Sequence, residues 1–168
     1  AIYAVTGGVP AYLNLFTRTK SFMSALHEEC LIPGSIMLGD PAVILHEQLK
    51  EPQSFEAVLS SIASGFHKWS EIARISGVTE TSLGHYLQIL DELELVERRD
   101  PIFASPQGRQ GQYYLQHHFL RFYYRFIVPN LSKIERGYLD IVVEQIREDL
   151  RAFIGTYVFE ELCREWTL

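Results

Sequence analysis

Apolar side chains between residues 52 and 116 change partway from a helical spacing to a strand-like spacing. Steps of three and four residues predict three consecutive amphipathic helices in the first part. The apolar positions of these helices are Phe55, Val58, Leu59, Ile62 and Ala63, then Trp69, Ile72, Ala73 and Ile75, then Leu83, Tyr86, Leu87, Leu90 and Leu93. Residues 95–99 and 112–116 are then typical of two strands. Three helices followed by a hairpin predict a winged helix-turn-helix domain over residues 52–116.

Turn and cap residues separate these predicted elements. Gly65 follows the first helix and Gly77 follows the second, and glycine readily adopts the conformation that ends a helix. Thr79 has a side chain that can cap the third helix. The link of residues 76–79 fits the joint of a helix-turn-helix, which often contains glycine. Residues 105–111 are polar, so we expect a loop between the two strands.

The first 51 residues predict a set of short helices. Residues 11–16 form an apolar helical turn after Pro10, and a second helix over residues 21–30 stops before Pro33. Asp40 followed by Pro41 is a start signal for a helix over residues 42–49, because Asp caps the free N–H groups and Pro loses no hydrogen bond there.

The last third of the chain is also helical by pattern. Residues 119–127 predict an aromatic helix that is apolar around most of its circumference and therefore buried, with Pro129 at its end. An apolar stripe from Leu139 to Phe153 predicts another helix, and residues 157–166 a final amphipathic one. The predicted fold class is mainly α with a small antiparallel β wing, a winged helix-turn-helix flanked by helical segments. The predicted divisions are residues 1–51, 52–116 and 117–168.

The charge of the chain is acidic in every part. The formal net charge is −6. Residues 1–51 carry 3 basic and 5 acidic side chains, residues 52–116 carry 5 and 8, and residues 117–168 carry 7 and 8, which gives −2, −3 and −1. No segment has the basic footprint of an avid nucleic-acid binder. Two distant cysteines, short apolar runs and no signal peptide favour a cytoplasmic protein without a membrane span.

Four short motifs occur in a recognisable order. They are residues 6–13 (TGGVPAYL), 61–65 (SIASG), 70–73 (SEIA) and 119–126 (FLRFYYRF). With them the chain resembles the C-terminal part of archaeal-type P-loop ATPases of the AAA-like, STAND-related group. That resemblance implies a remnant of the helical lid, a winged helix, and the first helix of a restriction-endonuclease-like domain of the "domain of unknown function 234" type. A departure is His117 and His118, where the family tends to have an aspartate.

The resemblance also implies a nucleotide contact at Gly8 and Pro10. In the family, the proline of this Gly-x-Pro motif lies against the adenine ring and the glycine permits close backbone approach; the alternative is a plain turn before a helix. ATP with Mg²⁺ is implied for the full-length parent, with a nucleotide-binding domain as a partner in cis. No cofactor, catalytic residue or metal site is expected in this fragment, because none of its four lysines follows a glycine as a P-loop requires. The parent is expected to be an ATPase.

Residues 79–92 are the candidate recognition helix of the winged helix. Its exposed side chains Thr81, Ser82, His85 and Gln88 can hydrogen-bond phosphates or base edges. The helix contains no Lys or Arg, so the positive charge comes from the wing residues Arg98 and Arg109 and from Arg99 beside Arg98. Two or three phosphate contacts predict weak binding to double-stranded DNA with a shallow salt dependence. A protein-docking or spacer role is the alternative.

Two other polar pairs are interpreted as structural. Arg121 and Arg125 lie four residues apart on the aromatic helix, where pairing with carboxylates is expected more than phosphate binding. His117 and His118 are adjacent, so they make a poor pair of metal ligands and a capping or solvent-exposed role is expected.

Three functions remain open at this point. The first is a non-catalytic part of a P-loop ATPase whose winged helix couples nucleotide state to DNA or partner binding. The second is a free-standing winged-helix transcription regulator that dimerises through the aromatic helix. The third is a protein-interaction scaffold, which the acidic charge favours.

Overall fold

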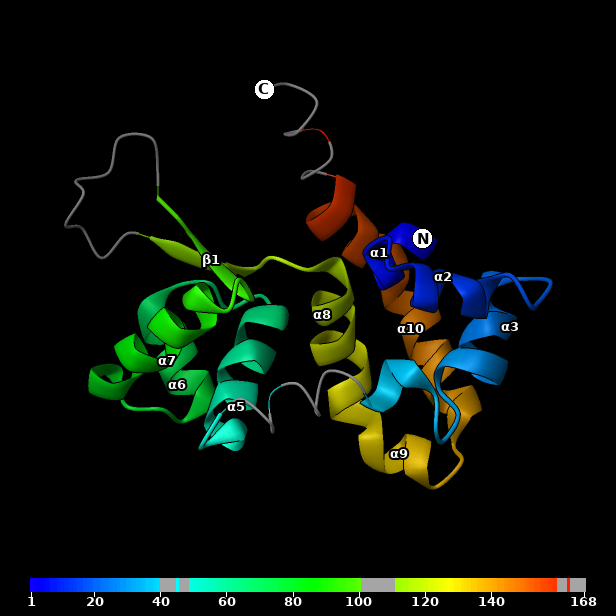
Figure 1. Ribbon diagram of the computed structural model, residues 1–168, viewed down its shortest axis with the longest axis horizontal. Helices are drawn as coiled ribbons and strands as arrows, with labels where there is room; N and C mark the ends of the chain where they lie inside the picture. Colours follow the sequence, from blue (N-terminus) through cyan, green and yellow to red (C-terminus); the bar gives the residue numbers. More distant parts are fainter. Residues whose placement is uncertain (40–44, 46–48, 101–110, 160–162, 164–168) are drawn as a thin grey trace. The chain divides into compact units, whose positions relative to one another are not determined.

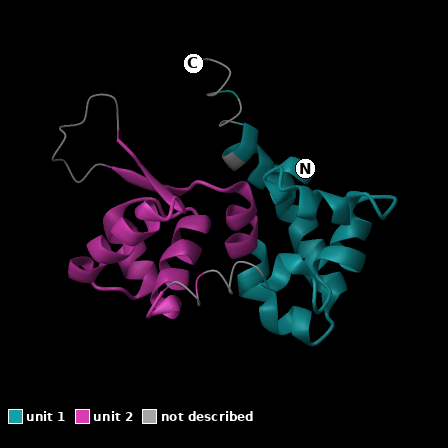
Figure 2. Ribbon diagram, in the orientation of Figure 1, with its two compact units in different colours: residues 1–42, 126–168 teal, residues 43–125 magenta. Residues whose placement is uncertain are grey.

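The computed structural model describes residues 1–39, 45, 49–100, 111–159 and 163. The chain divides into two compact units (Figure 2). Unit 1 is made of residues 1–42 and 126–168, and unit 2 of residues 43–125. Unit 2 therefore contains the whole segment in which the apolar spacing changes, whereas unit 1 is assembled from both ends of the chain (Figure 1).

Three helices begin unit 2, and their bounds follow the sequence signals. They are α5 (Pro52–Ala63), α6 (Trp69–Ser76) and α7 (Glu80–Glu92). Pro52 stands at the first turn of α5, where a missing N–H costs nothing. Gly77 ends α6 in the left-handed conformation with φ 74°, and the Thr79 side chain accepts a hydrogen bond from the Ser82 N–H at 3.3 Å. These observations confirm the three predicted helices and the joint between the last two.

A small antiparallel hairpin follows α7. It consists of β1 (Val96–Arg99) and β2 (Gln112–Leu115), with Val96 opposite Leu115 and Arg99 opposite Gln112. Val96 and Leu115 are buried, so one face of the hairpin closes the core of the three helices. The core side chains of these helices are Phe55, Val58, Leu59, Ile62, Ile72, Leu83, Leu87 and Leu90. The predicted fold class, mainly α with a small antiparallel β wing, is confirmed. The predicted loop over 105–111 lies outside the described residues except for Gly111.

The link between α5 and α6 pairs with the two-stranded hairpin through an isolated β-bridge. Lys68 pairs with Gln112 in an antiparallel bridge, and the Tyr113 N–H donates to the His67 carbonyl at 2.9 Å. β2 therefore pairs with β1 along one edge and with residues 67–68 of this link along the other. The sequence pattern did not predict this bridge, since two residues are too few to show an alternating spacing.

The aromatic segment after β2 is helical, but its hydrogen bonding changes along its length. It begins as α8 (His118–Phe122), continues as the π-helical turn η2 (Tyr123–Ile127), and tightens into the 3₁₀ turn η3 (Val128–Asn130) that contains Pro129. The aromatic side chains Phe119, Phe122, Tyr123, Tyr124 and Phe126 are all buried. The prediction of a buried aromatic helix is confirmed, and Pro129 lies in the turn where the wider helix has ended.

Unit 1 is helical throughout the described residues. From the start of the chain it takes α1 (Ile2–Thr6), α2 (Pro10–Phe16), α3 (Phe22–Ala25) and the π-helical turn η1 (Leu26–Cys30). From the end it takes α9 (Leu131–Glu135), α10 (Leu139–Ile154) and the π-helical turn η4 (Gly155–Phe159). η1 contacts both α2 and α10, which joins the two ends. A membrane-spanning helix, which would have to be both long and apolar, is not found among the described helices.

The predicted helices of unit 1 are confirmed where the structure describes them. Ser21 caps α3 by accepting a hydrogen bond from the Ser24 N–H at 3.1 Å, and the helical segment it starts ends at Cys30, before Pro33. The stripe from Leu139 to Phe153 is the buried face of α10. The helix predicted over residues 42–49 lies mostly outside the described residues, and so does most of the final predicted helix.

Candidate interface on α7 and the hairpin

The four α7 residues predicted to contact a ligand all lie on its exposed surface. Thr81 and Ser82 are held at the start of the helix by the hydroxyl of Thr79, each with an oxygen–oxygen distance of 3.0 Å. Gln88 donates to the carboxylate of Glu92 at 2.9 Å. These residues share one side of the helix because three- and four-residue steps bring side chains to the same face.

His85 occupies the middle of this exposed side of α7. Its ring lies 5.8 Å from the ring of Tyr86, whose hydroxyl donates to the Glu51 carboxylate at 2.8 Å. The exposed side of α7 therefore presents hydroxyl, imidazole and amide groups but no cation. A surface of this kind can form hydrogen bonds to a ligand, whereas it supplies no charge that would attract a phosphate.

The wing arginines that the structure describes are engaged in ion pairs within the hairpin. Arg98 is exposed and its guanidinium lies 2.8 Å from the Asp100 carboxylate. Arg99 pairs with Glu97, which lies two positions earlier on the same strand and on the same face. Arg109, the third wing arginine predicted to contact nucleic acid, lies outside the described residues.

The helix-turn-helix surface carries a net negative charge. Residues 69–92 contain one basic side chain, Arg74, and four acidic ones, Glu71, Glu80, Asp91 and Glu92, which gives 1 − 4 = −3. Because Arg98 and Arg99 are already paired with carboxylates, the hairpin does little to offset this charge. The local field of this surface opposes a polyanion and favours a cationic ligand.

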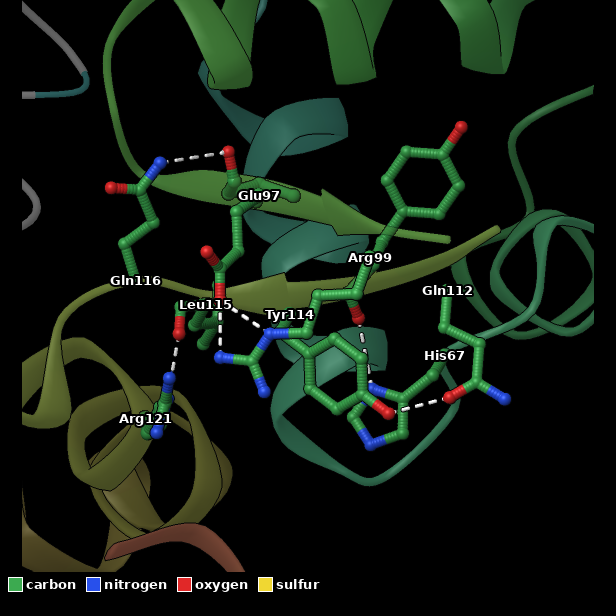
Figure 3. Close-up of polar contacts among 10 residues, drawn as sticks. His67, Glu97, Arg99, Gln112, Tyr114, Leu115, Gln116 and Arg121 are labelled. Carbon is green, nitrogen blue, oxygen red and sulfur yellow. Dashed lines mark hydrogen bonds and ion pairs between the residues drawn. The ribbon is translucent and has the colours of Figure 1, made fainter. Parts of the chain in front are cut away.

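A stack of polar and aromatic side chains covers the hairpin face opposite the core. Figure 3 shows the Tyr114 ring between the Arg99 guanidinium and the His67 imidazole. The guanidinium carbon is 4.3 Å from the Tyr114 ring centre, and the His67 ring stacks on Tyr114 at 4.2 Å with an interplanar angle of 21°. The Tyr114 hydroxyl donates to the Gln112 side chain at 2.5 Å. Through His67, this stack joins the link between α5 and α6 to the hairpin.

The sequence analysis did not identify this stack. The contact between Arg99 and Tyr114 could have been found from the sequence. Alternation along the strands puts residues 97 and 99 on the same face as residues 112 and 114. His67 could not be found in this way, because it reaches the hairpin from the link between two helices.

Burial lowers the pKa of His67 below its ordinary value. The hydrogen bond to the Tyr113 carbonyl and the charge of Glu71 oppose this shift, while Arg99 and Arg121 add to it. The imidazole is therefore neutral near pH 7. Its Nδ1 lies 2.9 Å from the Tyr113 carbonyl oxygen and donates to it, which fixes the tautomer.

Arg121 and Arg125 both donate to backbone carbonyl oxygens of unit 2. Arg121 is only 5% exposed, and its Nε donates to the Leu115 carbonyl at the end of β2 at 2.6 Å (Figure 3). Arg125 donates to the Ser64 carbonyl at 3.3 Å, just after α5. Both arginines therefore tie the aromatic helix to the ends of neighbouring elements by binding backbone oxygens.

Gly8 and Pro10, the two residues predicted to contact nucleotide, lie in the turn before α2. Gly8 has φ +81°, and a Cβ there would stand 3.4 Å from the Tyr3 ring. Pro10 is exposed at the first position of α2. An exposed proline beside an exposed glycine fits contact with a flat ring, and it equally fits a plain turn before a helix. The nucleotide contact stays a prediction.

Among the described residues, His, Cys, Asp and Glu side chains do not gather in groups of three or more that could hold a metal ion. His117 precedes α8 and is exposed, while His118 begins the helix and is partly buried. The exposure of His117 agrees with the exposed role that the sequence analysis expected, whereas its side chain makes no capping hydrogen bond to α8.

The C-terminal part of the chain matches a protein family, and the whole chain is similar to an archaeal protein. Residues 123–168 match the DUF234 family, described as archaea bacterial proteins of unknown function. Over 168 residues, 99% of the chain, the sequence is 34% identical to an uncharacterized protein of Methanocaldococcus jannaschii. The chain spans 37% of the length of that protein. No solved structure matches the chain. The match agrees with the type of C-terminal domain that the sequence resemblance implied.

Proposed function

We propose that the chain is a non-catalytic part of a longer, cytoplasmic P-loop ATPase, in which unit 2 is a winged-helix module that couples nucleotide state to the binding of DNA or a protein partner. ATP and Mg²⁺ would be bound by a nucleotide-binding domain elsewhere in the longer protein. The relative from M. jannaschii is compatible with this proposal, because the chain spans only 37% of it and leaves room for such a domain.

The observation that carries the proposal is the arrangement of unit 2. Three helices, a glycine-containing joint after α6 and a hairpin follow in the order of a winged helix, and α7 presents an exposed polar side. Thr79 fixes the start of α7 and the core leucines hold its other side, so the exposed side chains are displayed on a rigid element. Rigid display on a helix suits recognition of a partner better than chemistry.

Charge decides which partner is favoured within this proposal. The helix-turn-helix surface is negative, and the described arginines of the hairpin are ion-paired. Each neutralised phosphate contributes about −0.9 to the slope of log affinity against log salt, so two contacts predict a slope near −2. DNA binding through this surface would therefore be weak, and a protein partner is the better match.

The test is nucleotide-dependent protection of α7 in the longer protein that contains this chain. Amide hydrogen exchange is measured with and without a non-hydrolysable ATP analogue and Mg²⁺. We expect exchange of α7 and β1–β2 amides to change on nucleotide addition. Gly8→Ala, which strains a left-handed position in the turn before α2, should reduce the change, and Gly34→Ala, at another left-handed glycine of unit 1, is the matched control.

Two results would overturn the proposal. One is a natural upstream sequence with no Gly-x-x-x-x-Gly-Lys-Ser/Thr motif. The other is exchange in unit 2 that is the same with and without nucleotide, in a preparation that hydrolyses ATP.

A free-standing winged-helix transcription regulator is the second candidate, and the exposed hydrogen-bonding groups of His85 and Gln88 favour it. The chain alone would then bind duplex DNA in a low-salt gel-shift titration. Gln88→Ala would weaken that binding, whereas Gln145→Ala, on the exposed side of α10, would not. Absence of a shift with any duplex at low salt would exclude this candidate.

A further inference from the structure

Two half-buried aromatic rings meet on unit 2 where three of its elements come together. Trp69 begins α6 and Tyr113 lies on β2, and their ring centres are 6.2 Å apart with a tilt of 55°. Trp69 lies against α7 at Gly84, where a Cβ would stand 3.3 Å from the outer edge of the indole. A side chain at Gly84 would require the indole to shift slightly. We call these three residues the aromatic surface.

Carboxylates border the aromatic surface on several sides. Glu80 is one turn before Gly84 on α7, and Asp91 lies two turns after it, so both are on the same side of the helix as the glycine. Both carboxylates are exposed. Asp100 follows β1 and pairs with Arg98, which stands opposite Tyr113 in the hairpin register.

The titration of Tyr113 agrees with this placement of charge. Burial raises the pKa of its hydroxyl, Arg98 lowers it, and the carboxylates Asp100 and Asp91 raise it. Asp91 thus adds negative charge near the ring, while Arg98 and Asp100 neutralise each other in their ion pair. A ligand at the aromatic surface would meet negative charge and the faces of two rings.

We propose that the aromatic surface binds a segment of a protein partner that carries arginine or lysine, with the cation over the Trp69 ring and near Asp91. Tryptophan offers the strongest ring face for a cation, and arginine is the cation found there most often. The proposal rests on the proposed function and names the chemical class of the partner that the winged-helix module would bind.

Nucleic acid is the competing ligand, because bases also stack on exposed aromatic rings. However, a nucleic-acid strand that stacked on Trp69 would bring its phosphates beside Glu80 and Asp91. The net charge of residues 69–92 is −3, which repels phosphates. Charge complementarity therefore favours the cationic peptide.

The test uses tryptophan fluorescence of the chain. The sequence contains two tryptophans, so Trp166→Phe leaves Trp69 as the only reporter. This variant is titrated with octa-arginine, with octa-glutamate and with a short DNA duplex. We expect a saturable change of Trp69 emission with octa-arginine and none with the other two. A saturable change with the duplex that exceeds that with octa-arginine would overturn the proposal in favour of nucleic acid.

Charge-reversal variants show whether binding occurs at the aromatic surface. Asp91→Lys should weaken octa-arginine binding about two- to fivefold, whereas Asp149→Lys, an exposed aspartate of α10, should leave it unchanged. Equal effects of the two variants would mean that only net charge matters, and the proposal would fall.

Substitution of Trp69 itself separates ring chemistry from packing. With fluorescein-labelled octa-arginine, Trp69→Phe should keep most of the affinity, and Trp69→Leu should lose about two- to fivefold. Both keep an apolar side chain against Gly84, and urea unfolding checks that they fold. Equal affinity of the two variants would contradict a cation over the ring. If octa-arginine fails to bind but nucleotide still changes α7 exchange, this inference is wrong and the proposed function stands.

Discussion

At the scale of single residues, the polar groups inside unit 2 act through backbone partners. Arg121 is buried and donates to the carbonyl of Leu115, where β2 ends. A buried cation without partners would be strongly destabilising, so the carbonyl keeps this position tolerable and joins β2 to α8. His67 similarly donates to the Tyr113 carbonyl and stacks on Tyr114. Both residues fix the hairpin rather than form a reactive site.

His67 predicts a loss of stability in mild acid. Its pKa in the folded chain lies below 6.5, the ordinary value, because burial disfavours the imidazolium. Between these two pKa values the unfolded chain binds more protons, so the free energy of unfolding rises with pH there. We expect full stability above the ordinary pKa and a decline as the pH falls below it, measured by urea unfolding across that range.

Two histidine variants isolate this effect from the titration of other groups. His67→Gln should flatten the decline in the free energy of unfolding, whereas His85→Gln, at an exposed histidine of α7, should keep it. An unchanged decline in His67→Gln would show that another group is responsible.

At the scale of elements, unit 2 is built from short pieces that stabilise one another. β1 and β2 each have four residues, and an isolated hairpin of that size is marginal in water. The bridge from residues 67–68, the stack on Tyr114 and the burial of Val96 and Leu115 supply the missing stability. α7 in turn depends on a side-chain cap, since its first N–H groups have no partner inside the helix.

The cap of α7 predicts a clear cost for Thr79→Ala. The Thr79 hydroxyl accepts from the Ser82 N–H, and loss of such a cap costs about 1 kcal/mol of the free energy of unfolding. Urea unfolding followed by circular dichroism measures this difference. Thr81→Ala, at the second position of α7, removes a hydroxyl that contacts the Thr79 hydroxyl rather than the Ser82 N–H, and should cost less. A smaller effect for Thr79→Ala than for Thr81→Ala would refute the capping role.

At the scale of the molecule, unit 1 joins the two ends of the sequence. η1 contacts α10, and His27 of η1 lies 3.1 Å from the Asp140 carboxylate at the start of α10. The core of unit 1 draws on both ends, with Leu26 and Cys30 from the first and Val142 and Ile146 from the second all buried. Burial raises the pKa of the Cys30 thiol to about 12, and the negative charge of Glu29 contributes a smaller part of this increase. Cys30 is therefore a packing residue.

Because the two ends share one core, a destabilising substitution in α10 should also destabilise η1. Ile146→Ala removes a fully buried side chain of α10 and should cost about 2–5 kcal/mol of the free energy of unfolding. Hydrogen exchange should then accelerate in η1 as well as in α10. Ile141→Ala, on the same helix but 53% exposed, is the control and should change little. Normal protection of η1 in Ile146→Ala would show that the two ends do not form one core.

Much of the fold could be predicted from spacing, because spacing reflects which side of an element is buried. Leu83, Leu87 and Leu90 marked the buried side of α7, and therefore also indicated that His85 and Gln88 would be exposed. The changes of helical hydrogen bonding at η1 and η2 could not be predicted, since they leave the apolar spacing almost unaltered. Whether α7 binds any ligand stays a prediction.

The sequence by itself determined the three helices of unit 2, the buried stripe of α10, the cap at Thr79, the hairpin and the acidic balance, because each depends on neighbours along the chain. The tertiary structure alone decided which distant residues meet. It put His67 and Arg99 on either side of Tyr114, gave Arg121 a carbonyl partner, and joined both ends of the chain in unit 1. Such contacts depend on how elements fold onto one another, and no local spacing of residues carries that information.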